Sequence, residues 1–183
     1  MYSGRSDSTQ VSLHNAVNLR RPLPDVFSYP YLHNAIGHCI APPIPASQLG
    51  SQPTLETALL LRRTLNAYTA DTESLKAQQG WVSRMYHGKR PPVFPSAVGA
   101  EYGIVTNWRS AKLSEMDFRG ARSDSEGPVN PSFIFCAVPE SYNVPVRGAL
   151  AVVCESDEGI WIAMGLGERV WERVRASGLF GFA

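Results

Sequence analysis

The order of strand-like and helix-like patterns limits the folds open to this chain more than any other feature. The first half predicts a strand over 11–20, stopped by prolines, and a short strand within 31–40. After a linker over 46–53, apolar residues recur at helical spacing over 54–70, with Thr54 as the expected N-cap. A second helix is expected from Asp71 or Thr72 to about Gly88.

The second half of the chain is richer in strands. The pattern predicts one strand over 100–108, a long polar loop over 119–131, and strands over 133–138, 149–154 and 160–164, followed by a helix that ends before Gly178. This order is not the regular alternation of strand and helix that a doubly wound sheet requires. We expect an α+β fold with a mixed sheet and helices packed on one face.

Charge and composition exclude several classes of function. The net charge of +1 gives no electrostatic basis for binding nucleic acid or an anionic membrane, and no apolar run approaches the length of a membrane span. The polar residues 1–9 are interpreted as a disordered lead, and 10–183 as one domain. The three cysteines, Cys39, Cys136 and Cys154, are expected to be free thiols in a reducing, cytoplasmic compartment; a disulfide or a metal site is the lesser alternative.

The histidines do not form a recognisable catalytic or metal-binding motif. His33, His38 and the adjacent Cys39 lack further ligands nearby in sequence, so we expect no metal site and no resident cofactor. His14 is followed four residues later by Asn18, and it is interpreted as a structural side chain. The sequence alone therefore shows no complete set of residues for acid–base or nucleophilic catalysis.

Five stretches together resemble the C-terminal half of the acyl-CoA-dependent acyltransferases of the BAHD type, and in particular the fungal branch that includes trichothecene acetyltransferases. The resemblance covers about residues 10–176. The first three elements are a strand that ends in VNLR at 17–20, a Y-x-x-N-A segment at 31–35, and a two-helix stretch within 56–82. The other two are a strand end similar to S-S-W or T-S-W at 106–108, and a segment similar to the D-F-G-x-G signature at 117–121.

This resemblance implies a chloramphenicol acetyltransferase-like domain that forms one side of a channel. In the family, an acyl-CoA enters the channel from one end and an alcohol or amine acceptor from the other. The co-substrate implied here is acetyl-CoA or another acyl-CoA, and the implied reaction is acetyl transfer to a hydroxyl of a fungal-type secondary metabolite. A neutral histidine of an H-x-x-x-D motif acts as general base in the N-terminal domain of such enzymes.

The resemblance also assigns roles to two groups of residues. The channel is expected to be lined by Thr106, Asn107 and Trp108. The alternative, which we weight equally, is a purely structural role in which Trp108 belongs to the core and its neighbours cap the strand. Arg20, Asp117 and Gly120 are expected to form a structural clamp in which the arginine binds the carboxylate. Arg119 occupies a position where the family has glycine, and a positive φ there would imply strain.

The chain departs from the family pattern because it contains no H-x-x-x-D sequence. We therefore assign no catalytic residue and expect the half that carries the general base to be absent. The alternatives are a catalytically inactive remnant and a half that binds a complementary domain or another copy. A further possibility is an unrelated small α+β binding protein. If a domain is absent, an apolar face should be exposed where it would pack.

Overall fold

The structure is a computed structural model that describes residues 8–27, 35–88, 99–121, 127–131, 134, 148–157 and 159–181. It divides into an N-terminal unit, residues 2–103, and a C-terminal unit, residues 104–183. Each unit is described by itself below. The strand predicted over 133–138 and Cys136 lie outside the described residues, Ile134 excepted.

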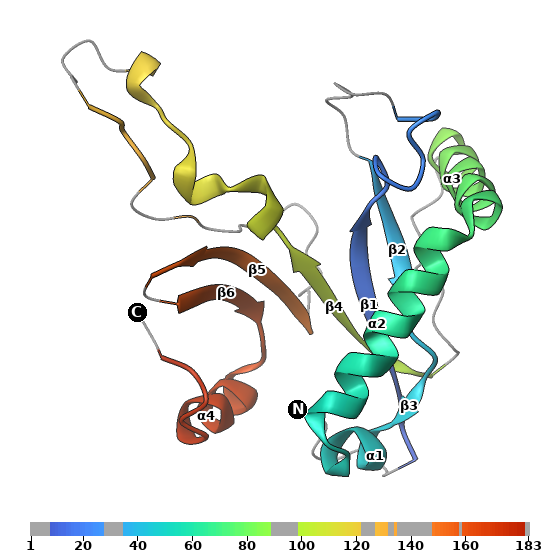
Figure 1. The fold of residues 1–183 in the computed structure, drawn as a ribbon. Helices are drawn as coiled ribbons and strands as arrows, with labels where there is room; N and C mark the ends of the chain where they lie inside the picture. Colours follow the sequence, from blue (N-terminus) through green and yellow to red (C-terminus); the bar gives the residue numbers. More distant parts are fainter. Residues whose placement is uncertain are drawn as a thin grey trace. The chain divides into compact units, whose positions relative to one another are not determined.

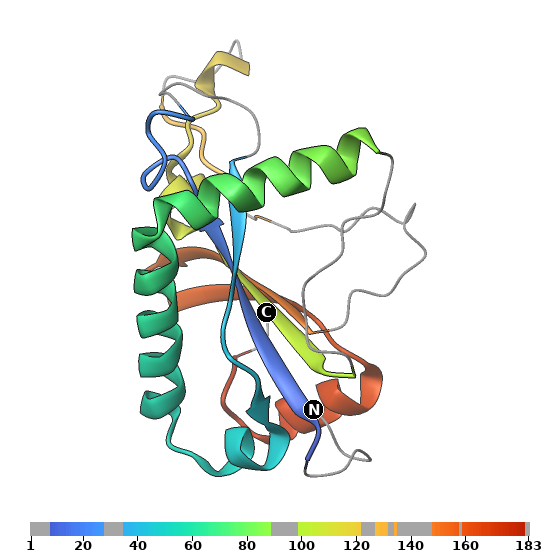
Figure 2. The same cartoon turned by 90° about the vertical axis from the view of Figure 1, so that its right-hand side faces the viewer.

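The N-terminal unit is built on a strand hairpin covered by two helices. Strand β1 (Gln10–Asn18) pairs antiparallel with β2 (Ile36–Ile40) and with the short β3 (Ile44–Pro45). Helix α1 (Ala46–Ser51) follows, and then α2 (Thr54–Ala70) and α3 (Thr72–His87). Figure 1 and Figure 2 show α2 and α3 on the same face of the β1–β2 hairpin, with α3 running across the end of α2.

The core of the N-terminal unit lies between the hairpin and these helices. Leu19, Leu23 and Leu75 are buried together, and Phe27 and Tyr68 pack against them. Tyr68 of α2 donates a hydrogen bond to Gln78 of α3, and its pKa is raised to about 12, mainly by burial. Since Leu75 and Gln78 both belong to α3, these contacts fix the angle between the two helices.

Gly37 of β2 lies against Tyr68 of α2. A Cβ atom built on Gly37 would lie 2.5 Å from the Tyr68 hydroxyl and 2.9 Å from a methyl group of Leu19. No real Cβ atom approaches heavy atoms that closely without a shift in the structure. The absence of a side chain at this position therefore allows Tyr68 to reach the strand.

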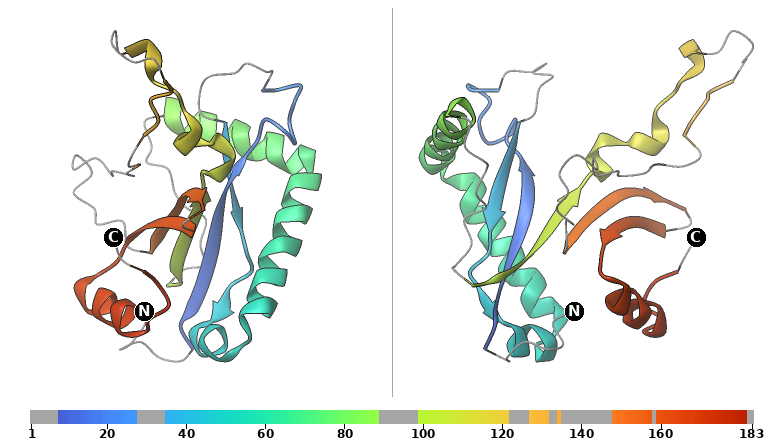
Figure 3. Two further views of the ribbon diagram at one scale, coloured as in Figure 1. Left: turned by 60° about the vertical axis from the view of Figure 1, so that its left-hand side comes forward. Right: turned by 180° about the vertical axis from the view of Figure 1, so that it is seen from behind.

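The C-terminal unit contains a mixed sheet with the order β4–β5–β6. The end of β4 (Glu101–Asn107) pairs parallel with β5 (Ala149–Ser156), and β5 pairs antiparallel with β6 (Gly159–Gly165). Three 3₁₀ turns follow β4: η1 (Arg109–Ala111), η2 (Leu113–Glu115) and η3 (Arg119–Ala121). Helix α4 (Glu168–Ala176) follows β6, and Figure 3 shows it beside the β5–β6 hairpin.

These elements confirm the predicted α+β class with a mixed sheet. Two details differ from expectation. The segment 46–53, expected to be a linker, contains α1, and Pro53 rather than Thr54 is the N-cap of α2. By contrast, Asp71 caps α3 as expected: its Oδ1 accepts a hydrogen bond from the Ser74 backbone N–H at 3.0 Å, and this bond lowers the pKa of the Asp71 carboxyl.

Burial is much less complete than the apolar pattern predicted. Helix α2 has no fully buried residue, and its Leu55 and Leu59 are 68% and 44% exposed. Among the described residues of the C-terminal unit, only Ala151 and Val153 are fully buried. Exposed apolar residues therefore occur in both units.

Candidate functional site

The polar end of β4 holds the three residues predicted to line a channel. In register with β5, Thr106 lies opposite Ala151 and Asn107 opposite Val152, and the Trp108 backbone N–H donates to the Val152 carbonyl at 2.8 Å. Successive side chains of a strand point to opposite faces of its sheet. Thr106 and Trp108 therefore share one face, and Asn107 lies on the other.

The shared face is organised by one hydrogen bond. The indole Nε1–H of Trp108 donates to Oγ1 of Thr106 at 3.0 Å, and both side chains are partly buried. Because an indole nitrogen can only donate, the threonine oxygen acts as acceptor and its own hydrogen points elsewhere. The pair can thus present one hydroxyl donor beside an aromatic surface.

Asn107 is held on the opposite face by Arg109. Its Oδ1 accepts from the Arg109 backbone N–H at 3.1 Å and from Arg109 Nε at 3.3 Å, while Arg109 Nη1 donates to Glu155 Oε2 at 2.9 Å. A guanidinium has no acceptor, so this contact fixes which end of the amide is oxygen. Asn107 thereby caps the turn that follows β4, and its place in a channel stays a prediction.

The predicted channel residues are therefore neighbours in sequence but not one convergent group. The structure joins Thr106 to Trp108 and joins Asn107 to Arg109 and Glu155. Sequence reasoning missed Arg109 and Glu155, whose contact spans 46 positions of the chain. Strand alternation alone was sufficient to separate Asn107 from its two neighbours.

Asp117 organises the second predicted cluster. Its Oδ1 accepts from the backbone N–H groups of Val129 at 3.0 Å and Arg119 at 2.9 Å, and its Oδ2 accepts from Arg119 Nε at 2.8 Å. The Val129 bond, followed by the bonds from Arg119, lowers the pKa of the Asp117 carboxyl. The Phe118 N–H also donates to the Val129 carbonyl at 2.8 Å. Asp117 thus ties the segment 127–131 to the η2–η3 region.

The two positions after Phe118 carry none of the expected backbone strain. Arg119 belongs to η3, and Lys112 is the one non-glycine residue with positive φ in the described part of the chain. Gly120 also lacks a positive φ, and a Cβ atom placed on it would meet no atom within 4 Å. The altered motif is therefore accommodated in a 3₁₀ turn that any residue can adopt.

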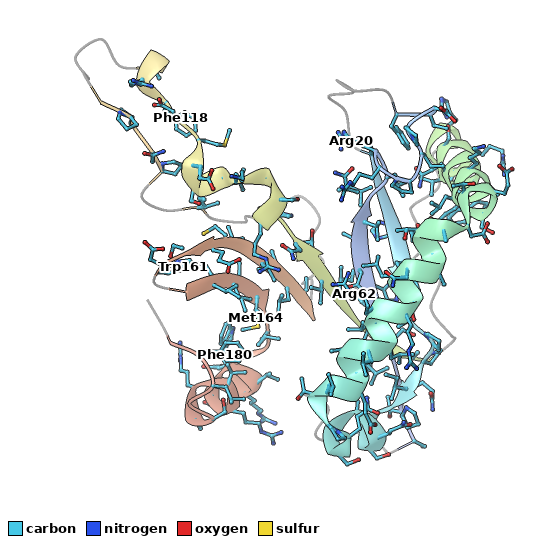
Figure 4. The ribbon with its side chains drawn as sticks, viewed as in Figure 1. Arg20, Arg62, Phe118, Trp161, Met164 and Phe180 are labelled. Carbon is cyan, nitrogen blue, oxygen red and sulfur yellow. The ribbon has the colours of Figure 1, made fainter. Side chains whose placement is uncertain are left out.

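The predicted partner of Asp117, Arg20, belongs to the other unit. Its backbone N–H and Nη1 donate to Oδ1 of Asn18 at 3.1 and 3.3 Å. Among the described residues of the C-terminal unit, Arg119 binds the Asp117 carboxylate, with Nη2 at 2.6 Å from Oδ2. Figure 4 labels Arg20 in the N-terminal unit and Phe118, next to Asp117, in the C-terminal unit. An Arg20–Asp117 clamp stays a prediction.

The local role of Asp117 can be tested directly. We expect Asp117→Ala to accelerate hydrogen exchange at the Val129 amide, because this amide loses its acceptor, whereas Arg119→Ala should accelerate it less. Arg20→Ala serves as the control. Slow exchange at Val129 in Asp117→Ala would contradict the assigned contact. A similar acceleration in Arg20→Ala would show that the predicted clamp also acts.

Two histidines of the N-terminal unit lie close together in the sheet. His14 is fully buried on β1 and lies opposite Ile40, while His38 lies opposite Ala16, so the two are diagonal neighbours on one sheet face. The His14 ring lies 6.0 Å from the Tyr102 ring. Burial, and then the neighbouring His38, lower the pKa of His14; burial also lowers that of His38.

This arrangement supports the structural interpretation of His14. Asn18, at the fourth position after it, has its Oδ1 engaged by Arg20, and so it does not act as the acidic partner of a general base. In the described ranges, no group of three histidine, cysteine or acidic side chains is placed to hold a metal ion. His33 lies outside these ranges. Cys39 and Cys154 are free thiols, and burial raises the pKa of Cys39.

No helix in the part of the chain that the structure describes is long and apolar enough to cross a membrane.

Comparison with known proteins identifies the class of fold. No protein-family model and no curated protein matches the sequence. Solved structures do match, and they are acyltransferases of the chloramphenicol acetyltransferase-like fold. The chain has the fold of one part of these enzymes, which confirms the resemblance noted from its motifs.

The matching structures include several of TRI101, a trichothecene acetyltransferase. The structure of F. sporotrichioides TRI101 with coenzyme A and T-2 matches 96% of this chain with a TM-score of 0.65 and 17% identity. That of F. graminearum TRI101 with coenzyme A and deoxynivalenol matches 94% with a TM-score of 0.61 and 17% identity. The chain spans only 38% and 36% of these proteins, respectively, so the likeness concerns one portion of their fold.

Proposed function

We propose that this chain is one half of an acyl-CoA-dependent O-acyltransferase, in which it forms a wall of the acyl-CoA channel but lacks the general base. The observation that carries this proposal is the match of almost the whole chain to enzymes solved with coenzyme A. The proposed reaction is acetyl transfer from acetyl-CoA to a hydroxyl of a fungal-type secondary metabolite. The acceptor is a small-molecule alcohol, because the related structures hold small molecules: T-2 and deoxynivalenol.

The chemistry of the strand end supports a binding role for this half. The Thr106 hydroxyl can donate to an oxygen of the substrate or of the pantetheine arm, since its own oxygen accepts from Trp108. The Trp108 ring offers an apolar surface beside that hydroxyl. Neither group is basic at neutral pH, so proton removal from the acceptor requires a histidine supplied by another segment or polypeptide.

The alternative function is a catalytically inactive remnant or a half-domain that binds a partner. It is favoured by the absence of an H-x-x-x-D sequence from these 183 residues. Both functions use the same fold, and they differ in whether coenzyme A binds.

Calorimetric titration of the full chain with coenzyme A separates these functions. We expect binding without turnover of acetyl-CoA, and turnover only when a polypeptide with the H-x-x-x-D histidine is added. Thr106→Val should weaken binding by about 3- to 10-fold, because one hydrogen bond is worth about 0.5–1.5 kcal/mol. Ser110→Ala, in the exposed η1 turn, is the matched control.

Two results would decide against this proposal. If the wild-type chain does not bind coenzyme A and no added polypeptide restores turnover, the chain is an inactive remnant. Turnover by the purified chain alone would contradict the absence of a general base. Equal affinity of the wild type and Thr106→Val would remove Thr106 from the channel.

A further inference from the structure

A single turn of the chain encloses Trp108, the aromatic residue at the end of β4. Oδ1 of Asn107 accepts a hydrogen bond from the Arg109 backbone N–H at 3.1 Å, so the residues on either side of Trp108 are joined to each other. A side-chain oxygen that accepts from the N–H two residues later forms an Asx turn, which restricts φ and ψ of the residue between them. Trp108 has φ −99° and ψ 0°, a sparsely populated region of the backbone map. This conformation is therefore held by the contact between its two neighbours.

The backbone of Trp108 determines where its indole ring lies. Its N–H donates to the Val152 carbonyl at 2.8 Å, and its C=O accepts from the Ala111 N–H at 2.8 Å, so the peptide groups on both sides are fixed. From this position the indole Nε1–H reaches Oγ1 of Thr106 at 3.0 Å. Opening of the Asx turn would move the ring away from the threonine and break this bond, because a hydrogen bond weakens steeply with distance and misalignment. The turn thus controls the contact that orients the Thr106 hydroxyl.

Arg109 closes the turn with its side chain as well as with its backbone. Its Nε donates to the same Asn107 oxygen at 3.3 Å, and its Nη1 donates to Oε2 of Glu155 at 2.9 Å. The guanidinium is a rigid plane, so anchoring Nη1 on the carboxylate also sets the direction of Nε. Glu155 belongs to β5, 46 positions later in the chain, and it ties the turn to a second strand.

An irregularity in β5 turns Glu155 toward the sheet face that carries Asn107. Before the irregularity, Val152 lies opposite Asn107 of β4 and Ile162 of β6. After it, Glu155 lies opposite Ile160, so three steps along β5 correspond to two steps along β6. Opposite residues point to the same face, and so do residues two apart in one strand; Glu155 therefore shares the face of Asn107. In a regular strand the third residue after Val152 would point to the other face, so the bulge brings the carboxylate within reach of the turn.

We propose that Glu155 and Arg109 are positioning residues for the binding of coenzyme A. They hold Trp108 in the orientation in which its indole donates to Thr106. They act through the Asx turn and not on the ligand, because Glu155 and Asn107 lie on the face of the sheet opposite to the tryptophan and threonine. The inference rests on the proposed function, in which these two side chains bind coenzyme A.

The indole N–H of Trp108 reports directly on this role. Its solvent-exchange rate can be measured by proton–nitrogen NMR of the full chain, and its signal is assigned by its loss in Trp108→Phe. The Trp81 indole, in the N-terminal unit, is the internal reference. Glu155→Ala should accelerate exchange at Trp108 by about 2- to 5-fold, because the side chains of this ion pair are exposed and such pairs contribute modestly. Glu155→Gln keeps an acceptor for Arg109 and should accelerate exchange less.

Glu115→Ala is the matched control. Glu115 is another exposed glutamate of the C-terminal unit, and its carboxylate pairs with Lys112 at 2.8 Å. This pair spans three positions of the chain and lies outside the Asx turn. The exchange rate of the Trp108 indole in Glu115→Ala should therefore equal that of the wild type.

Coenzyme A titration tests whether the positioning serves the ligand. Glu155→Ala should weaken binding by about 2- to 5-fold. Charge alone predicts the opposite sign, because the loss of a carboxylate reduces repulsion of the anionic coenzyme. In a Trp108→Ala background the same substitution should have no further effect, since Glu155 acts through the tryptophan. Glu115→Ala removes an equal charge outside the turn, and it should not weaken binding.

Three results would overturn the proposal. The first is a wild-type exchange rate of the Trp108 indole in Glu155→Ala, or an equal acceleration in Glu115→Ala. The second is unchanged affinity for coenzyme A despite faster exchange. The third is a loss of affinity in Glu155→Ala that persists when Trp108 is already alanine. If the wild type itself does not bind coenzyme A, the proposed function fails, and the exchange rates still decide whether Glu155 holds Trp108.

Discussion

The substitution Leu75→Ala is expected to lower the free energy of unfolding of the N-terminal unit by about 2–5 kcal/mol. Leu75 is 1% exposed and packs with Leu19 and Leu23, which belong to the chain segment after β1. Among the described side chains of α3 it is the fully buried one, so alanine would leave a cavity between this helix and the segment after β1. Denaturant unfolding followed by far-ultraviolet circular dichroism measures the change.

Leu55→Ala is the matched control for this experiment. Leu55 is a leucine in α2, the neighbouring helix, and it is 68% exposed. Its truncation should change the free energy of unfolding by less than about 0.5 kcal/mol. A loss for Leu55→Ala equal to that for Leu75→Ala would mean that α2 buries its first turn in solution, contrary to the structure.

Acid is expected to destabilise the N-terminal unit through His14 and His38. Burial lowers the pKa of both side chains, and the charge of His38 adds to the effect on His14. The folded state therefore binds fewer protons than the unfolded state, whose histidines titrate near about 6.5. The full contribution to stability is present above that pH, and it is lost as the pH falls through 6.5 toward the lower pKa values of the folded state.

His14→Phe isolates this effect. The phenyl ring keeps an aromatic neighbour for Tyr102, whose ring lies 6.0 Å from His14, but it cannot be protonated. The free energy of unfolding of His14→Phe should fall less between neutral and mildly acidic pH than that of the wild type. Parallel pH profiles for the wild type and His14→Phe would exclude His14 as a cause.

The element order of this fold could be predicted from the sequence because the long elements carry strong periodic patterns. The predicted helix over 54–70 coincides with α2, and the strand and hairpin predictions agree with β1, β4, β5 and β6 to within a few residues. Helix α1 was missed because its six residues are too few to show periodicity and include Gly50. Its position depends on a tertiary contact, in which the Ala46 N–H donates to the Thr9 carbonyl at 2.8 Å.

The polar contacts of the candidate site were harder to predict than its location. The sequence drew attention to 106–108 and to Asp117, but their partners are set by the folded backbone. The Asp117 carboxylate accepts a hydrogen bond from the Val129 backbone N–H. The Arg109 guanidinium donates one to Glu155, which lies on the strand paired with β4. Apolar periodicity also predicted burial for Leu55 and Leu59, but both are exposed. Periodicity identifies the apolar face of a helix, and it does not show whether the rest of the chain covers that face.

The close approach of Gly37 and Tyr68 has a consequence for how such sequences diverge. A side chain at position 37 and a phenol at position 68 compete for the same space, since the Cβ atom would lie 2.5 Å from the hydroxyl. Two substitutions that are each harmful alone can therefore be tolerated together, with a larger residue on the strand and a smaller one on the helix. An alignment of related chains should show these two positions, 31 residues apart, exchanging volume as a covarying pair.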